Sequence, residues 1–258
     1  MNAIFKPFGP ESMMWMINRE RIVLLAGPAA AVLQVAHPVV AMGVAAHSHF
    51  RIDSTGRLRR TLAAVYTVAF GSVREIEIVR ERVAKAHRPV QGAGYSASDP
   101  AAQLWVLATL IMGSVTLFER YIRKLSSKEK DCFLEEHRAF GSIFGLNPDA
   151  LPKTWIAFQA YWTETINGGS LCSCAVSPEV ANAVIRPDAP WFMRVLSPVL
   201  RALAVEYIPA TIQQRLAIRP GILRRPLWRL LDIILPGILA MIPDSIRYAP
   251  QYLHARAQ

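Results

Sequence analysis

The chain has 258 residues, which is long enough for one large domain with a substantial buried core. Hydrophobic residues make up 52% of it, the mean hydropathy is +0.24 and the formal net charge is +10, so contact with a membrane has to be considered. Three cysteines are too few for a disulfide framework, which excludes a disulfide-stapled secreted module and fits a reducing compartment.

The first residues do not predict a secretory signal. Lys6, Pro7, Pro10 and Glu11 stand where a signal peptide has an uninterrupted apolar stretch. We therefore expect a cytoplasmic protein, and we expect a single domain over residues 1–258.

Helical periodicity runs through most of the chain, whereas strand signals are scarce, so we predict an all-α protein. The expected helices cover residues 11–27, 29–35, 38–47, 56–70, 72–87, 100–124, 127–144 and 151–166. Ser126 and Glu129 predict a capping box at the start of one helix. The last helix places Trp155, Phe158 and Trp162 on one face.

Two long uncharged runs are candidates for membrane spans. Residues 22–50 contain Pro28 and Pro38, and because an interior proline costs a helix about 3 kcal/mol, we expect two buried helices there. Residues 100–118 are diluted by polar side chains and flanked by charged segments, so we predict a central helix of the core.

His87, at the end of the expected helix 72–87, is the first candidate for a metal ligand. The apolar stripe of this helix is formed by Ile76, Val79, Val83, Ala86 and His87. Charged residues occupy the opposite arc, so we expect the imidazole to point inward. It lies near a chain reversal that begins at Pro89, where a cofactor can approach. The alternative is a hydrogen-bonded core histidine.

Arg57, Arg60 and Thr61 form a second candidate cluster. They share one face of the expected helix 56–70 and lie beside its apolar stripe. Two guanidinium groups and a hydroxyl in that position suit a polar or anionic ligand, such as a carboxylate, a propionate or bound oxygen. The alternative is a surface run of charge.

Further histidines and cysteines offer weaker metal sites. His47 and His49 do not share a helix face, so chelation by both requires a loop, and hydrogen bonding in a pocket together with His37 is the alternative. Cys172 and Cys174 could bind a soft metal, but the chain has no second such pair, and the alternative is that both are packing residues.

The C-terminal part, from about residue 177, is divided by prolines into expected helices of about ten residues. From Arg186 onward, ten arginines and four acids supply +6 of the net charge. These arginines alternate with bulky apolar residues, which suits peripheral contact with an anionic membrane, and the alternative is a solvated rim around a helical core. No zinc-finger spacing or ribonucleoprotein-type motif occurs, so no nucleic-acid partner is expected.

Several common catalytic patterns are absent from the sequence. No Glu-x-x-His pair occurs, which argues against a ferritin-like di-iron site. A His-Glu-x-x-His motif, a Walker phosphate loop and a Gly-x-Ser-x-Gly elbow are absent too. Residues 92–97 match a relaxed dinucleotide fingerprint by letter, but no strand precedes them.

Several segments resemble, in content and in order, the family that contains the bacterial latex-clearing rubber oxygenases and the fungal membrane-bound oxygenase of mycophenolic acid synthesis. They are residues 34–51, 56–61, 70–71, 83–87, 95–97, 99–100, 104–106 and 248–250. This resemblance covers almost the whole chain.

The resemblance implies a largely helical fold with a globin-like core that holds haem b through one histidine, and His87 is the matching position. Arg57, Arg60 and Thr61 match the spacing of an arginine, a lysine and a threonine on the distal side. Arg60 departs from this pattern, because a guanidinium stays protonated and is a poor ligand. We therefore expect a five-coordinate or water-bound iron, with Arg57 or Arg60 donating to bound oxygen or to a propionate.

Two further departures concern the catalytic base. Ala46 precedes His47 where many relatives look acidic, and Leu107 stands where many have histidine. The base is therefore unassigned, and these departures argue against rubber-type cleavage of double bonds.

The hypothesis is a haem-dependent oxygenase that uses molecular oxygen on an apolar or isoprenoid-like small molecule. His87 would ligate the iron, and Arg57, Arg60 and Thr61 would be the catalytic residues on the distal side. One alternative is a haem-binding sensor or carrier without turnover. Another is a non-haem helical protein that docks on a membrane surface.

Overall fold

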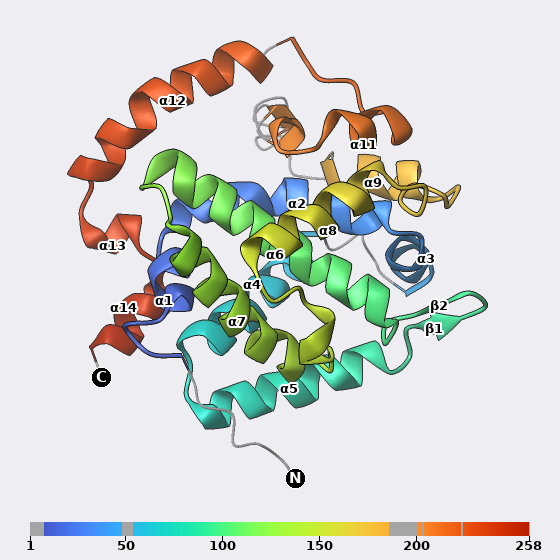
Figure 1. Cartoon of the computed structure of the whole chain (residues 1–258), viewed down its shortest axis with the longest axis horizontal. Helices are drawn as coiled ribbons and strands as arrows, with labels where there is room; N and C mark the ends of the chain where they lie inside the picture. Colours follow the sequence, from blue (N-terminus) through green and yellow to red (C-terminus); the bar gives the residue numbers. More distant parts are fainter. Residues whose placement is uncertain (1–7, 48–53, 186–200, 203, 223, 258) are drawn as a thin grey trace.

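Helix α6 (Pro100–Tyr121) runs through the middle of the protein, and the other helices pack around it in this computed structural model (Figure 1). The structure describes residues 8–47, 54–185, 201–202, 204–222 and 224–257, with side chains of α4 from residue 59 onward. In these ranges the chain forms helices and one short hairpin, which confirms the all-α class.

The N-terminal region forms two short helices where one was predicted. These are α1 (Met13–Asn18) and the 3-10 helix η1 (Arg21–Ala26). The chain is extended at Glu20, which forms an isolated bridge with Tyr248. The prediction of one continuous helix was wrong because the carboxylate of Glu20 is fully buried and is bound by Arg247 of the distant C-terminal segment, which donates to both of its oxygens.

The next two helices confirm the interpretation of residues 22–50 as separate helices. Helix α2 (Gly27–Ala36) and helix α3 (Pro38–His47) meet at His37, and the η1–α2 unit is bent by 101° relative to α3. The proline after the bend starts α3, as expected from its fixed φ. Helix α2 is largely buried, whereas the last residues of α3 are exposed.

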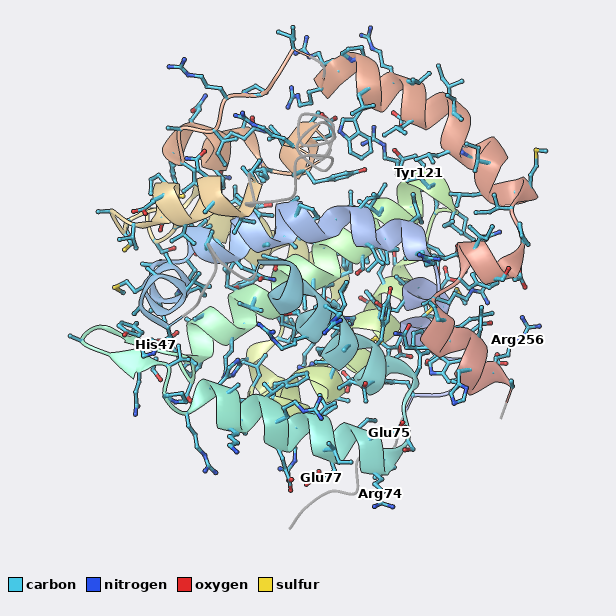
Figure 2. All side chains as sticks on the ribbon, turned by 180° about the vertical axis from the view of Figure 1, so that it is seen from behind. His47, Arg74, Glu75, Glu77, Tyr121 and Arg256 are labelled. Atoms are coloured by element: carbon cyan, nitrogen blue, oxygen red, sulfur yellow. The ribbon has the colours of Figure 1, made fainter. Side chains whose placement is uncertain are left out.

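Helices α4 (Ser54–Phe70) and α5 (Val73–His87) pack against each other, and the chain reverses between them at Gly71 and Ser72 (Figure 2). Ser72 and Glu75 form a capping box at the start of α5. A two-stranded hairpin of β1 (Gln91–Gly92) and β2 (Tyr95–Ser96) follows α5 and leads into α6.

Helix α6 is the core helix that residues 100–118 predicted. Trp105, Ile111 and Phe118 are essentially inaccessible to solvent, and the Trp105 indole N–H donates to the carbonyl of Leu33 at 2.6 Å. Among the described residues, α6 is long and apolar enough to cross a membrane, and the bent η1–α2–α3 unit passes the same test.

Two more helices cover α6 from the other side. Helix α7 (Ser127–Ile143) begins with the predicted capping box of Ser126 and Glu129. After a 3-10 turn η2 (Pro148–Ala150), helix α8 (Trp155–Asn167) begins four residues later than predicted, because Thr154 caps it. Trp162 of α8 stacks on Trp105 with ring centroids 5.1 Å apart.

The C-terminal part wraps the rim of the molecule (Figure 1). Its described elements are α9 (Ser177–Ile185), α11 (Ala210–Arg215), α12 (Arg224–Met241), α13 (Asp244–Arg247) and α14 (Pro250–Arg256). The prediction of helices of about ten residues was wrong for α12, which has 18 residues and continues through Pro226 and Pro236. Trp228 and Leu239 are buried on one side of α12. The free energy gained from burying them outweighs the local cost of the prolines to the helix.

Candidate functional site

Two histidines singled out from the sequence, His47 and His87, lie at one end of the molecule, which we call the hairpin end. It consists of the C-terminal ends of α3 and α5, the hairpin and the N-terminus of α6. Figure 2 shows His47 at this end and Glu75 at the opposite end of α5. Gly43 permits the close approach of α3 to the hairpin, because a Cβ there would lie 3.2 Å from Val90 Cγ1.

His87 occupies the last turn of α5 at the hairpin end, but it does not point inward as expected. Ile76 and Val79 are buried and Val83 is half-buried, whereas Ala86 and His87 are exposed. The apolar stripe therefore meets the core only along the first two-thirds of α5, and the last turn extends past the neighbouring helices. The charged residues predicted for the outward arc are exposed, and Arg80 and Glu77 form an ion pair on it.

Arg57, Arg60 and Thr61 lie in the N-terminal half of α4. Since the chain reverses between α4 and α5, this half lies on the same side of the molecule as the end of α5 that carries His87. Arg60 and Thr61 are exposed, and the side chain of Arg57 lies outside the described part. The two described members therefore lie at the surface of α4.

His47 and His37, both from the segment 34–51, lie in different environments. His47 shares a hydrogen bond of 2.9 Å between its Nε2 and the Tyr95 hydroxyl, and the two rings meet edge to face. His37 lies at the bend between α2 and α3, and no described residue hydrogen-bonds its buried Nδ1. Burial lowers the pKa of His37, with an opposing effect from Asp99. Burial therefore favours the neutral form of this ring. His49 lies outside the described residues.

The described residues contain no group of three or more His, Cys, Asp or Glu side chains that could hold a metal ion together. Cys172 and Cys174 do not belong to such a group. Both are partly buried and are not disulfide-bonded. Haem iron needs only one ligand from the protein, so this observation does not test the role of His87.

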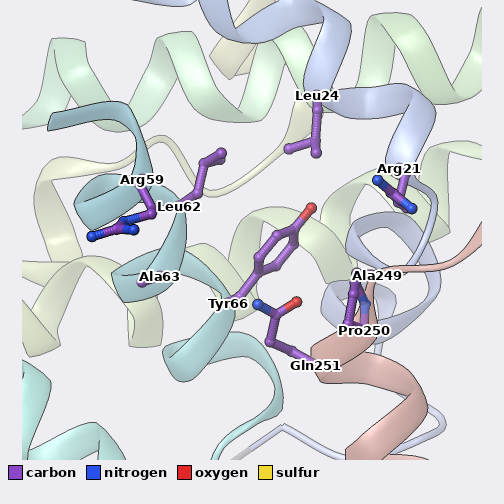
Figure 3. Close-up of a pocket in the computed structure, with 9 residues that line it drawn as sticks. All are labelled: Arg21, Leu24, Arg59, Leu62, Ala63, Tyr66, Ala249, Pro250 and Gln251. Carbon is purple, nitrogen blue, oxygen red and sulfur yellow. The ribbon is translucent and has the colours of Figure 1, made fainter. Parts of the chain in front are cut away.

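A separate cavity of about 360 Å³ lies between α4, η1 and the start of α14 (Figure 3). Tyr66 points its hydroxyl into this space, with Arg21 and Gln251 on one side and Arg59 and Leu62 on the other. The Tyr66 hydroxyl has no hydrogen-bond partner among the described residues. Burial raises the pKa of Tyr66 to about 12, so the phenol stays protonated and can donate to a polar group of a ligand.

The residues around this cavity were not singled out from the sequence, although a signal was present. Arg59, Leu62, Ala63 and Tyr66 have the spacing of one helical face, and this face is opposite to that of Arg57, Arg60 and Thr61. The cavity and the distal cluster, by which we mean Arg57, Arg60 and Thr61, are therefore on different sides of α4.

His137 of α7 was also overlooked. It is only 5% exposed, lies edge to face with Phe133 at 4.2 Å between ring centroids, and its Nδ1 lies 2.8 Å from the Phe133 carbonyl oxygen. Because a carbonyl only accepts, Nδ1 carries the hydrogen. Burial lowers the pKa of His137 to about 4. His137 is therefore a hydrogen-bonded core histidine, which is the alternative that the sequence left open for His87.

Residues 14–235 match the family described as ER-bound oxygenase mpaB/B'/Rubber oxygenase, catalytic domain. The chain belongs to this family. The match confirms the resemblance found in the ordered segments. It covers α1 to most of α12, and it includes both the hairpin end and the N-terminal half of α4.

Two curated relatives are mycobacterial. The uncharacterized proteins Mb2261 of Mycobacterium bovis and Rv2237 of Mycobacterium tuberculosis are each 28% identical to this chain over 152 residues. The matched stretch is 57% of this chain and 57% of each relative, so the chain spans little more than half the length of the curated relatives it matches. No solved structure matches the chain.

Proposed function

We propose that this protein is a haem-b-dependent oxygenase that uses molecular oxygen to oxidise an apolar or isoprenoid-like small molecule. The observation that supports the oxygenase activity is the family match over residues 14–235. The cofactor is inferred from what the family resemblance implies, with His87 at the matching position, and the substrate class from that resemblance together with the apolar composition of the chain.

Two histidines support a haem-binding role, His87 at the hairpin end and His37 at the bend between α2 and α3. His87 lies in the last turn of α5, where the family resemblance predicts the iron ligand. The unpartnered Nδ1 of His37 is a buried polar atom that a ligand would satisfy. When bound, haem would supply the activation of oxygen, which no side chain of the chain provides by itself.

The side chains of the distal cluster can form hydrogen bonds to a ligand, but they are not suited to coordinate iron. A guanidinium is a hydrogen-bond donor and a poor metal ligand, so Arg60 can donate to a propionate or to an oxygen-containing ligand but does not coordinate iron. Thr61, on the same face of α4, can donate one hydrogen bond and accept others. We assign Arg57, Arg60 and Thr61 to binding and orientation on the distal side, and His87 to the iron.

The visible spectrum of the haem-supplemented protein tests this assignment. A strong Soret band should appear in the wild type and should be lost in His87→Ala. His254→Ala is a matched control, because His254 is also an exposed histidine in the last turn of a helix, and its band should persist. A colourless wild type, or a His87→Ala variant that keeps its band, would contradict the proposal.

A haem-binding sensor or carrier without turnover is the second candidate. It is favoured by Leu107, which is 4% exposed in α6 and puts an apolar side chain where many relatives have histidine. Oxygen uptake by the haem-loaded protein with an isoprenoid alkene such as squalene distinguishes the two. Substrate-dependent uptake with an oxidised product identifies an oxygenase, whereas haem binding without uptake identifies a carrier or sensor.

A further inference from the structure

Helix α12 carries an apolar surface that faces away from the protein. Leu230, Ile233, Ile234 and Met241 are 52%, 78%, 40% and 85% exposed. They lie opposite Trp228 and Leu239, the residues of α12 that are buried against the body. Figure 1 shows α12 along the rim of the molecule, on the side away from the hairpin. A helix with two apolar sides at the rim has one side without a partner in the described chain.

The body side of α12 is firmly anchored. Arg120 of α6 donates to both carboxylate oxygens of Asp232, at 2.6 and 2.7 Å, and its guanidinium lies 4.5 Å from the centroid of the Trp228 ring. The Tyr121 hydroxyl donates to the same carboxylate at 3.1 Å. The one acid of α12 is thereby used toward the body, and the outward surface carries no negative charge.

Guanidinium groups with no acidic partner in the described part of the chain border the N-terminal end of this surface. Arg219, Arg225 and Arg229 are exposed, and no described residue pairs with their side chains. The described acids from residue 201 onward are all used elsewhere, in the ion pairs Glu206–Arg224, Asp232–Arg120 and Asp244–Arg256. The border of the apolar surface is therefore positively charged.

We propose that the outward surface of α12 docks on an anionic lipid bilayer. The helix would lie in the interface, with Ile233 and Met241 among the acyl chains and with Arg225 and Arg229 at the phosphate groups. A second copy of the chain fits less well, because its described part offers no unpaired carboxylate at this surface to receive the arginines. This inference does not depend on haem binding.

Flotation of the full-length protein with vesicles tests the apolar part of the surface. The wild type should float with phosphatidylcholine vesicles that contain phosphatidylglycerol, and Ile233→Asp should weaken binding roughly tenfold or more. Ile156→Asp on α8 is the matched control, because Ile156 is 80% exposed and Ile233 is 78% exposed. Met241→Asp provides a second variant, and the thermal midpoint of each variant verifies folding.

The charged border is tested with pairs of arginines. Arg225→Gln with Arg229→Gln should weaken binding to the anionic vesicles roughly tenfold or more and should reduce the sensitivity to salt. Arg74→Gln with Arg82→Gln on α5 removes the same net charge from another exposed site and should leave binding close to that of the wild type.

Three outcomes would overturn the proposal. The first is a wild type that does not float with anionic vesicles, and the second is equal loss of binding in Ile233→Asp and Ile156→Asp. The third is a lipid-independent dimer that Ile233→Asp dissociates, since this would identify a second copy as the occupant of the surface. Loss of the Soret band in any haem experiment has no bearing on these results, so the two proposals fail separately.

Discussion

Helices α6 and α12 are both long and rich in apolar residues, yet they occupy opposite environments. Isoleucine 111 of α6 has no exposed surface, whereas Ile233 of α12 is 78% exposed. Helix α6 contacts helices on several sides, whereas in the described part of the chain α12 meets the body along one side. The same residue type thus stabilises the fold in one helix and is available for a partner in the other.

The two helices are linked by a polar contact, which explains how the exposed helix keeps its place. Arg120 and Tyr121 at the end of α6 hold Asp232 in the middle of α12. The charged pair is partly solvated, so it contributes modestly to stability, but it fixes which side of α12 faces the protein. The comparison shows that hydrophobicity alone does not indicate burial.

The largest expected difference is between Ile111→Asp and Ile233→Asp. A carboxylate at position 111 would be buried without a partner and should lower the free energy of unfolding by about 4 kcal/mol or more. The same change at position 233 should alter it by less than about 0.5 kcal/mol, because that side chain is already in water. Denaturant titration of both variants measures this, and comparable losses would contradict the difference in environment.

Burial of His137 in the core next to α6 predicts that the protein loses stability in acid. Its pKa is lowered in the folded protein to about 4, so between its ordinary value of 6.5 and 4 only the unfolded state takes up a proton. Stability from this group is present above pH 6.5 and is lost as the pH falls toward 4, by about 3 kcal/mol in all.

The difference in unfolding free energy between wild type and His137→Phe isolates this effect. The variant should be less sensitive to acid across this interval, whereas His254→Gln, which changes an exposed histidine, should keep the slope of the wild type. Burial raises the pKa of Glu136, which acts in the opposite direction but is present in both proteins. An unchanged slope in His137→Phe would show that this ring is accessible to protons in the folded state.

The smallest expected effect has opposite signs in the two helices. An added Cβ at Gly113 of α6 would lie 2.9 Å from the Cβ of Ala26, so Gly113→Ala should lower stability by about 1–2 kcal/mol. At Gly237 of α12 no atom lies within 4 Å, so Gly237→Ala should raise stability by about 0.5–1 kcal/mol through helix propensity. Thermal midpoints decide this, and a rise in both variants would indicate looser packing of α6 on η1.

Local sequence signals predicted most helices and several of their ends. Ser126 with Glu129 marked the start of α7, and Pro38 marked the start of α3. The break at Glu20 was not predictable, because its cause is the contact with Arg247 and Tyr248 more than two hundred residues away. The prolines of α12 wrongly predicted short helices for a similar reason, because burial of Trp228 against the body is a tertiary effect.

The roles of Arg60, Thr61 and His87 stay predictions. Helical periodicity correctly placed Arg60 and Thr61 on one helix and His87 in the last turn of the next. Their exposure was not predictable, because periodicity indicates which residues share a face but not how far the core extends along it. The cavity at Tyr66 required the contributions of Arg21 and Gln251 from other segments.

The sequence by itself determined the class and the family of this protein, because helical periodicity, capping residues and ordered motifs are properties of neighbouring positions along the chain. Only the tertiary structure decided that His137 rather than His87 is the core histidine and that one side of α12 remains exposed. The physical reason is that burial depends on which surfaces meet in space, and residues far apart in the chain determine those meetings.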